Sequence, residues 1–121
     1  FPGISENLIT SILKTKGLKG LVLETYGSGN APTRPDFLRF LKESMQQGLA
    51  VLNVTQCQGG AVEMEKYQTG MALKEIGVLS GGDITTEAAI TKMMHVFGNF
   101  NDPAVIRKKI TASLRGEVSI N

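Results

Sequence analysis

The feature that most constrains this chain is a pair of short apolar runs, each of which leads into a glycine-containing loop. The first run is "GLVLETY", residues 20–26, and the second is "LAVLNVT", residues 49–55. Both are aliphatic and show no alternation of polar and apolar residues, which is typical of parallel strands covered on both faces. A segment with helical spacing separates them. We therefore expect two neighbouring parallel strands joined by a helical crossover.

Helical patterns alternate with extended ones along the whole chain. Ser5 suits the N-cap of a first helix, Pro35 suits the first turn of a second, and Asp102 followed by Pro103 suits the start of the last. The apolar spacing predicts helices over 5–16, 35–47, 65–77, 85–98 and 102–116, with a short extended piece over 78–83. This order predicts an α/β fold, in which a small parallel sheet of about four strands is flanked by helices in a Rossmann-like three-layer sandwich.

The two glycine loops are the candidate binding elements, because parallel sheets bind ligands beyond the carboxyl ends of their strands. The loop "GSGNAP", residues 27–32, could present backbone N–H groups to a carboxylate, with Asn30 offering an amide. It lacks the lysine of a P-loop and the third glycine of a dinucleotide fingerprint, so a plain turn is the simpler interpretation. In "NVTQCQGG", Thr55, Gln56 and Cys57 place a hydroxyl, an amide and a thiol at the same edge.

Composition excludes several function classes. The net charge is +2 and the basic residues are scattered, so the basic stripe of a nucleic-acid-binding protein is missing. The apolar runs are too short to cross a bilayer. The chain has one cysteine, Cys57, and one histidine, His95, which allows neither an internal disulfide nor a Cys/His zinc site and fits a reducing cytosol. We expect no metal, no cofactor, no nucleic acid and no membrane partner.

A catalytic pair is also not evident. Cys57 would need a partner base, and His95 lies in the apolar run "KMMHVF", which favours packing. Thr91 and Lys92 are adjacent on a predicted helix and point about 100° apart, so they do not face each other.

Five separated motifs nevertheless form a pattern. "YGSGNAP", "NVTQCQGG", "YQTGMAL", "GVLSGGDITTEAAITK" and "LRGE", in this order and at this spacing, resemble the carboxyl-terminal domain of type I (cytosolic) L-asparaginases. The resemblance covers nearly the whole chain, residues 1–121, and implies one domain. The opening "FPGIS" is typical of a strand end, so we expect the chain to be part of a longer protein.

The resemblance implies hydrolysis of L-asparagine to aspartate and ammonia in the cytoplasm by a homodimer or homotetramer, without a cofactor. The threonine nucleophile and its supporting residues belong to the family's larger amino-terminal domain, so no catalytic residue is expected in this chain. The smaller domain packs against a neighbouring subunit and helps to close its active site. Ser28, Asn30 and Glu63 are the residues that we expect near that junction.

Some members of the family also bind asparagine at a regulatory pocket between subunits. That pocket uses an arginine at the end of the first strand together with the Thr and Cys of "TQC", which correspond here to Thr55 and Cys57. The arginine position holds Glu24, whose carboxylate would repel the carboxylate of the ligand. We therefore expect weak or absent regulation by asparagine.

Three alternatives use the same residues. The chain could be a stand-alone module that binds a small amino acid or dimerises without catalysis, and such a module would have its own start codon. It could instead belong to the related transferase subunit that supplies ammonia for amidating charged tRNA, although the modest net charge does not favour a nucleic-acid surface. A doubly wound signalling domain would need clustered acidic residues at its strand ends, and the run "NVTQC" has none.

Overall fold

The structure is a computed structural model that describes residues 5–25, 35–55 and 68–119 of the chain. Helices and strands alternate as the sequence predicts. Their order is α1 (Glu6–Leu13), β1 (Gly20–Thr25), α2 (Pro35–Gln46), β2 (Ala50–Thr55), α3 (Gln68–Glu75), β3 (Leu79–Ser80), α4 (Thr86–Asn99) and α5 (Pro103–Thr111). None of the helices in these ranges is long and apolar enough to cross a membrane.

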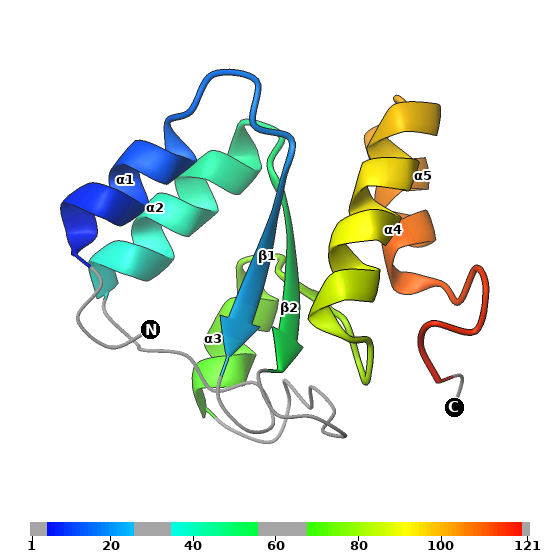
Figure 1. The fold of residues 1–121 in the computed structure, drawn as a ribbon. Helices are drawn as coiled ribbons and strands as arrows, with labels where there is room; N and C mark the ends of the chain where they lie inside the picture. Colours follow the sequence, from blue (N-terminus) through cyan, green and yellow to red (C-terminus); the bar gives the residue numbers. More distant parts are fainter. Residues whose placement is uncertain (1–4, 26–34, 56–67, 120–121) are drawn as a thin grey trace.

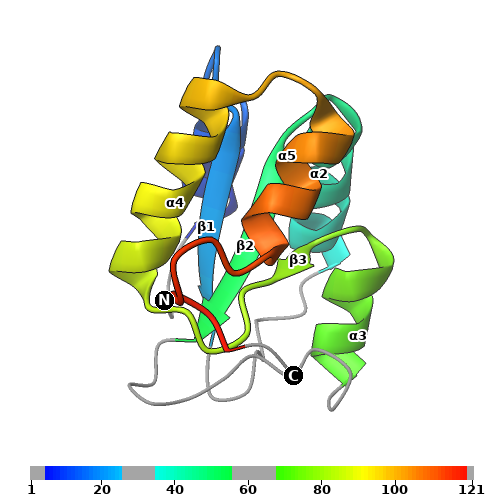
Figure 2. The same cartoon turned by 90° about the vertical axis from the view of Figure 1, so that its right-hand side faces the viewer.

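The strands form one parallel sheet in the order β1-β2-β3, and β1 pairs with β2 over six residues, from Gly20↔Ala50 to Thr25↔Thr55. Helices α1 and α2 lie on one side of the sheet, and α4 and α5 lie on the other (Figures 1 and 2). The predicted three-layer α/β arrangement is therefore confirmed. In the described residues the sheet has three strands, one fewer than the four or so that the sequence predicts.

Helices α1, α4 and α5 begin at residues whose side chains satisfy free backbone donors of the first turn. Ser5 Oγ accepts from the Leu8 N–H at 3.2 Å, and Thr85 Oγ1 accepts from the Ala88 N–H at 3.2 Å. Asp102 Oδ1 accepts from the Ala104 N–H at 2.9 Å. Each such cap contributes about 1 kcal/mol to the stability of its helix. These contacts confirm the predicted starts of α1, α4 and α5.

The described residues form two apolar core clusters, one on each face of the sheet. Side chains alternate between the faces of a strand, so β2 supplies both clusters. Val51 packs with Leu41 of α2 and Leu73 of α3, and half-buried Leu13 of α1 joins the same cluster. Leu52 and Val54 point to the other face, where the second cluster also includes Ala89, Met93, Val96 and Ile110 from α4 and α5.

The two long strands differ in burial. Every residue of β2 is buried, as its apolar sequence predicts. β1 is buried only at Thr25, and Gly20 to Leu23 are half-buried, so the prediction that this run is buried on both faces is wrong for β1. The reason is its position at the end of the strand order, since no strand in the described part of the chain lies beyond it.

Candidate functional site

The candidate site is the edge of the sheet where β1 and β2 end. Thr25 and Thr55, the last residues of these strands, are paired in the register. The two glycine loops, residues 26–34 and 56–67, follow directly and lie outside the described residues. Four predicted site residues fall in them, namely Ser28, Asn30, Cys57 and Glu63. The site can therefore be built from the strand ends and from the elements that pack beside them.

A buried neutral hydrogen bond joins the two strand ends. Thr25 Oγ1 donates to Asn53 Oδ1 at 2.7 Å and also approaches the Val54 carbonyl oxygen at 3.3 Å. Both side chains are almost completely inaccessible. Asn53 Nδ2 is buried too, and in the described residues it has no hydrogen-bond partner. A buried donor left unpaired costs about 1–3 kcal/mol. The two N–H groups of Asn53 Nδ2 can therefore still donate to an acceptor.

A second contact connects the end of β1 to the start of α4. The Thr86 hydroxyl donates to Glu24 Oε1 at 2.6 Å. Thr86 is the first residue of α4, where the helix dipole favours a negative charge. The Glu24 carboxylate thus ties the edge strand to the helix that covers the opposite face of the sheet from α2.

Strand alternation separates two of the predicted residues. Glu24 pairs with Val54, which belongs to the cluster beneath α4 and α5, whereas Thr55 lies at the next register position. Side chains at successive positions point to opposite faces. Glu24 is therefore directed toward α4, and Thr55 toward the face covered by α1 and α2. The strand register does not bring these two residues together on one face.

The turn between β3 and α4 closes tightly against the end of β2. The Gly81 N–H donates to the Asn53 carbonyl at 2.8 Å. A Cβ atom at Gly81 would lie 2.8 Å from Ile84 Cγ2 and 2.9 Å from the Asn53 oxygen, too close for any residue but glycine. Gly82 follows with φ of 59°, which also favours glycine. Packing thus explains Gly81, and backbone conformation explains Gly82.

A buried ion pair fastens the C-terminal segment to α4. Lys92 Nζ lies 2.7 Å from Glu117 Oε1, and the two side chains are 4% and 13% exposed. Lys92 also donates to the Ala112 carbonyl. Burial raises the pKa of Glu117, but the Lys92 ammonium and the N–H groups of Leu114 and Arg115 outweigh it and lower this pKa to about 2.

Asp83 fastens the same segment at a second point. Its carboxylate accepts from the Ser119 N–H at 2.7 Å and from the Ser119 hydroxyl. These hydrogen bonds hold the pKa of Asp83 below its ordinary value. The N-cap of α4 itself is Thr85.

The described residues that the sequence offers as a catalytic pair, Thr91 and Lys92, bind other groups and not each other. Thr91 Oγ1 donates to the carbonyls of Glu87 and Ala88 within its own helix, while Lys92 binds Glu117. His95 is exposed rather than packed in the core, with the Asn99 amide beside its ring. No group of three or more His, Cys, Asp or Glu side chains gathers in residues 5–25, 35–55 and 68–119.

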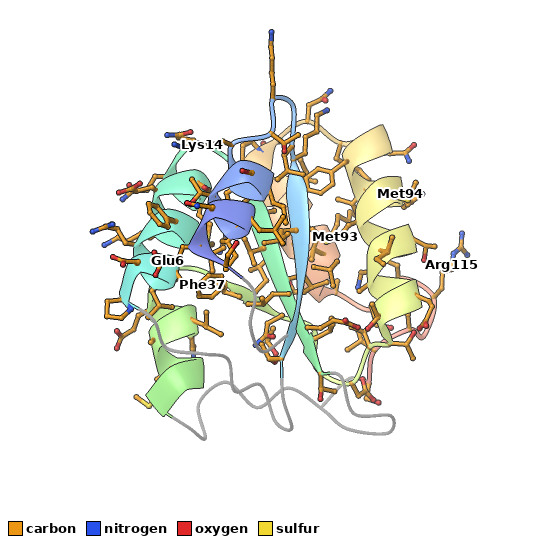
Figure 3. The ribbon with its side chains drawn as sticks, turned by 60° about the vertical axis from the view of Figure 1, so that its left-hand side comes forward. Glu6, Lys14, Phe37, Met93, Met94 and Arg115 are labelled. Carbon is orange, nitrogen blue, oxygen red and sulfur yellow. The ribbon has the colours of Figure 1, made fainter. Side chains whose placement is uncertain are left out.

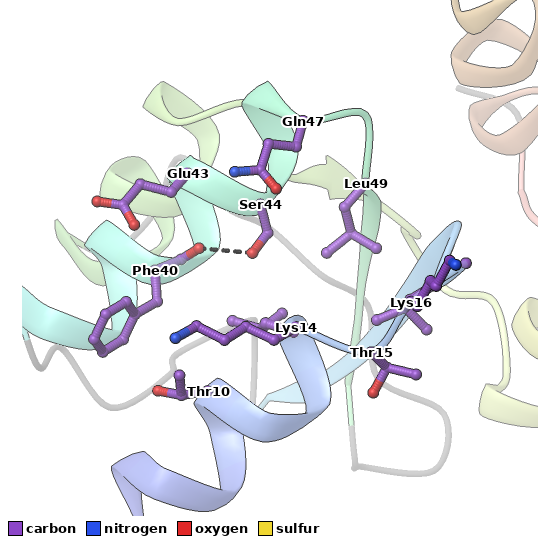
Figure 4. A pocket seen from close by; sticks show the side chains of 12 residues that line it. Thr10, Lys14, Thr15, Lys16, Phe40, Glu43, Ser44, Gln47 and Leu49 are labelled. Atoms are coloured by element: carbon purple, nitrogen blue, oxygen red, sulfur yellow. Dashed lines mark hydrogen bonds between the residues drawn. The ribbon is translucent and has the colours of Figure 1, made fainter.

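A cleft of about 370 Å³ lies between the end of α1 and α2. Lys14, Thr15, Glu43 and Gln47 are among its lining residues (Figure 4). Leu18 and Leu49, which precede β1 and β2, also line it. The cleft is therefore at the amino ends of the strands, away from Glu24 and Thr55.

Sequence reasoning missed the contacts of Asn53, Lys92 and Glu117. Lys92 carried a usable indication, because it lies in the buried stripe of α4 with Ala89, Met93 and Val96. A lysine in an apolar stripe requires a buried partner. The partner, Glu117, lies in a segment without helical or strand periodicity, so only the fold identifies it.

Comparison with known proteins completes the description. Residues 1–109 match the family described as "Glutaminase/Asparaginase C-terminal domain". The chain is 41% identical over 119 residues to L-asparaginase 1 of Escherichia coli, covering 98% of this chain and 35% of that protein. It is 43% identical over 120 residues to the human 60 kDa lysophospholipase, covering 98% of this chain and 21% of that protein.

A crystal structure of L-asparaginase I from Vibrio cholerae shares the fold, with a TM-score of 0.90 and 38% identity. The match covers 99% of this chain and 36% of that one. The chain thus spans about a third of the length of the asparaginases that it resembles.

Proposed function

Because this chain belongs to the glutaminase/asparaginase C-terminal domain family, we propose that it is the smaller domain of an L-asparaginase, a single domain over residues 1–121. The complete protein hydrolyses L-asparagine to L-aspartate and ammonia without a cofactor. Its catalytic threonines come from an upstream domain. The observation that carries this proposal is the family match over residues 1–109, together with coverage of only 35% of L-asparaginase 1.

The side-chain contacts support a role in assembly rather than in the chemical step. A nucleophile must be held within hydrogen-bond reach of its base. In the described part of the chain, the adjacent Thr91 and Lys92 bind helix carbonyls and Glu117 instead of each other. The domain therefore completes a pocket whose reacting groups lie elsewhere.

Ser28, Asn30 and Glu63 are the residues that we assign to the junction with a neighbouring subunit's active site. They follow β1 and β2 at the carboxyl edge, where parallel sheets bind ligands. The protein assembles as a homodimer or homotetramer, and its single cysteine fits a cytoplasmic location. Glu24, Thr55 and Cys57 are our candidates for a regulatory site, in which the Glu24 carboxylate, directed to the opposite face of the sheet from Thr55, opposes binding of asparagine.

The test is ammonia release by the full-length protein. We expect turnover of L-asparagine by the full-length enzyme and none by residues 1–121 alone. The similarity to a 60 kDa lysophospholipase gives the competing activity, so fatty-acid release from a lysophospholipid should be measured in parallel. Ester hydrolysis without ammonia release would overturn the proposal, as would turnover by residues 1–121 alone.

Asn30→Ala in the full-length enzyme tests the assigned junction. We expect kcat/KM for asparagine to fall on the order of tenfold or more, because a lost positioning contact weakens transition-state binding. Ser113→Ala, outside the glycine loops, is the matched control. Equal kinetics for the two variants would remove Asn30 from the site.

A further inference from the structure

A second cleft, of about 250 Å³, lies at the amino end of the sheet. It is bordered by the start of β2, by the end of α2 and by the connection between α4 and α5. Figure 2 shows the amino ends of the long strands and the α4–α5 connection at one end of the molecule, opposite to the end at which β1 and β2 finish. The cleft is therefore separate from the candidate site at the carboxyl edge.

The walls of this cleft are mostly apolar. Met45 of α2 packs against one core cluster, whereas Phe97, Phe100 and Ile106 pack against the other. All four side chains are half-buried. The sheet separates the two clusters elsewhere, but at this end side chains from both line the same space. Small-molecule sites are lined in this way, by apolar side chains with a few polar groups among them.

The wall that α4 contributes is held in place by the sheet. Met93 lies toward the sheet (Figure 3), and Phe97 follows one turn later in the same helix. A Cβ atom at Gly20 would lie 2.6 Å from Met93 Cε and 2.5 Å from the Phe97 ring. The Phe97 ring thus rests on the backbone of β1. A wall that is formed before the ligand arrives loses little side-chain freedom on binding.

The ionisable residues that line the cleft are both cationic. They are Lys19, directly before β1, and Arg107 of α5, and the described lining contains no acidic residue. Arg107 Nη2 donates to the Gly77 carbonyl at 3.2 Å, which positions the guanidinium. Because a guanidinium carries five N–H donors, this one contact leaves donors for an anion. The fork geometry of arginine suits a carboxylate in particular.

We propose that this cleft binds a small organic carboxylate with an apolar body. The carboxylate is held by Arg107 and Lys19, and the hydrocarbon lies between Met45 and Phe100. At about 30 Å³ for each water-sized group, the cleft admits roughly eight such groups, which is the size of hexanoate. The inference goes beyond the proposed function, because it neither uses the carboxyl edge nor depends on hydrolysis of asparagine.

Isothermal titration calorimetry of the full-length protein with simple probes tests the chemistry of the cleft. We expect affinity to rise from acetate through butyrate to hexanoate, by about fourfold for each methylene group that is buried. Hexylammonium has the same apolar body with the opposite charge and should not bind. Equal affinity for hexanoate and hexylammonium would overturn the proposal. Displacement of hexanoate by asparagine would also overturn it, because the probe would then occupy the carboxyl edge.

Arg107→Gln tests the location. Glutamine keeps a donor for the Gly77 carbonyl and removes the charge, so the Kd for hexanoate should rise on the order of tenfold or more. Arg107 is exposed, and ammonia release from asparagine should stay unchanged, which shows that the variant folds. Lys108→Gln, at the exposed next residue of α5, is the matched control. Equal Kd values for the two variants would overturn the proposal.

Sedimentation velocity distinguishes a second copy of the chain as the occupant. A small carboxylate in the cleft predicts that Arg107→Gln leaves the oligomeric state unchanged. If hexanoate does not bind and Arg107→Gln weakens self-association, a second copy covers the cleft and the proposal is wrong.

Discussion

The two faces of the sheet are closed differently at its carboxyl edge. On the α4 face the contacts involve carboxylates: Glu117 pairs with the Lys92 ammonium, while Glu24 and Asp83 accept hydrogen bonds from Thr86 and Ser119. On the α2 face the contact is neutral and fully buried, between Thr25 and Asn53. The first set joins segments that are distant in the sequence, whereas the second joins the ends of two paired strands.

The contacts on the α4 face stabilise the fold, whereas the contact on the α2 face leaves a group that can take part in binding. The Lys92–Glu117 and Asp83–Ser119 contacts fasten the C-terminal segment to α4 and to the turn before it, so that face is closed by groups of this chain. On the α2 face, Asn53 Nδ2 has no partner in the described residues and can still donate to an acceptor. We therefore expect substitutions at Lys92 and Glu117 to act mainly on unfolding, and those on the α2 face to act on both unfolding and asparagine turnover.

The largest expected effect is that of Lys92→Met. Removing one member of a buried ion pair leaves the other charge uncompensated and costs about 3–5 kcal/mol. Urea unfolding of the full-length protein measures this, with Lys108→Met on the exposed side of α5 as the control. Equal unfolding free energies for the two variants would mean that the ion pair does not hold the C-terminal segment.

The pH dependence of the unfolding free energy tests the same ion pair on the α4 face. The folded-state pKa of Glu117, about 2, lies below the ordinary value of 4.5, so its ionised form stabilises the fold above pH 4.5. That contribution is lost as the pH falls from 4.5 toward 2. The difference in unfolding free energy between the native protein and Glu117→Gln should be constant above pH 5 and shrink below it. A difference that grows with acidity would exclude the ionic role.

Thr25→Val probes the α2 face and should have a smaller effect. It removes the donor to Asn53 Oδ1 and leaves a buried acceptor unpaired, at a cost of about 1–3 kcal/mol. Thr111→Val, at an exposed hydroxyl that bonds to its own helix, is the matched control. Thr25→Val should also raise KM for asparagine, because Thr25 is the residue from which the first glycine loop departs. An unchanged KM would limit Thr25 to a structural role.

The sequence predicts most of the fold because its apolar spacing and its helix-capping residues indicate the same elements. The apolar run of β2, the caps at Ser5 and Thr85, and the Asp102–Pro103 start all indicate the elements that the structure contains. β1 is the exception, since a doubly buried sequence here forms a half-buried edge strand. Burial of a strand depends on its place in the sheet as well as on its residues, and β1 stands at the end of the strand order in the described residues.

The candidate site was harder to predict for a different reason. Strand ends are visible in the sequence, so Glu24 and Thr55 could be assigned to one edge. The face to which each points depends on register, which separates them by one position. Partners such as Glu117 for Lys92 and Thr86 for Glu24 are long-range contacts that leave no periodic pattern.

The smallest expected effect on unfolding is at Glu24, an exposed carboxylate on the α4 face. Glu24→Gln keeps an acceptor for the Thr86 hydroxyl and removes the charge, so its unfolding midpoint should stay close to that of the native protein. The informative measurement is kinetic. With Glu24 intact we expect the rate of the full-length enzyme to depend hyperbolically on asparagine, since one carboxylate repels another. If the native enzyme instead gives a sigmoidal curve that Glu24→Gln leaves unchanged, Glu24 is no barrier to a regulatory ligand, and its charge serves only to join β1 to α4.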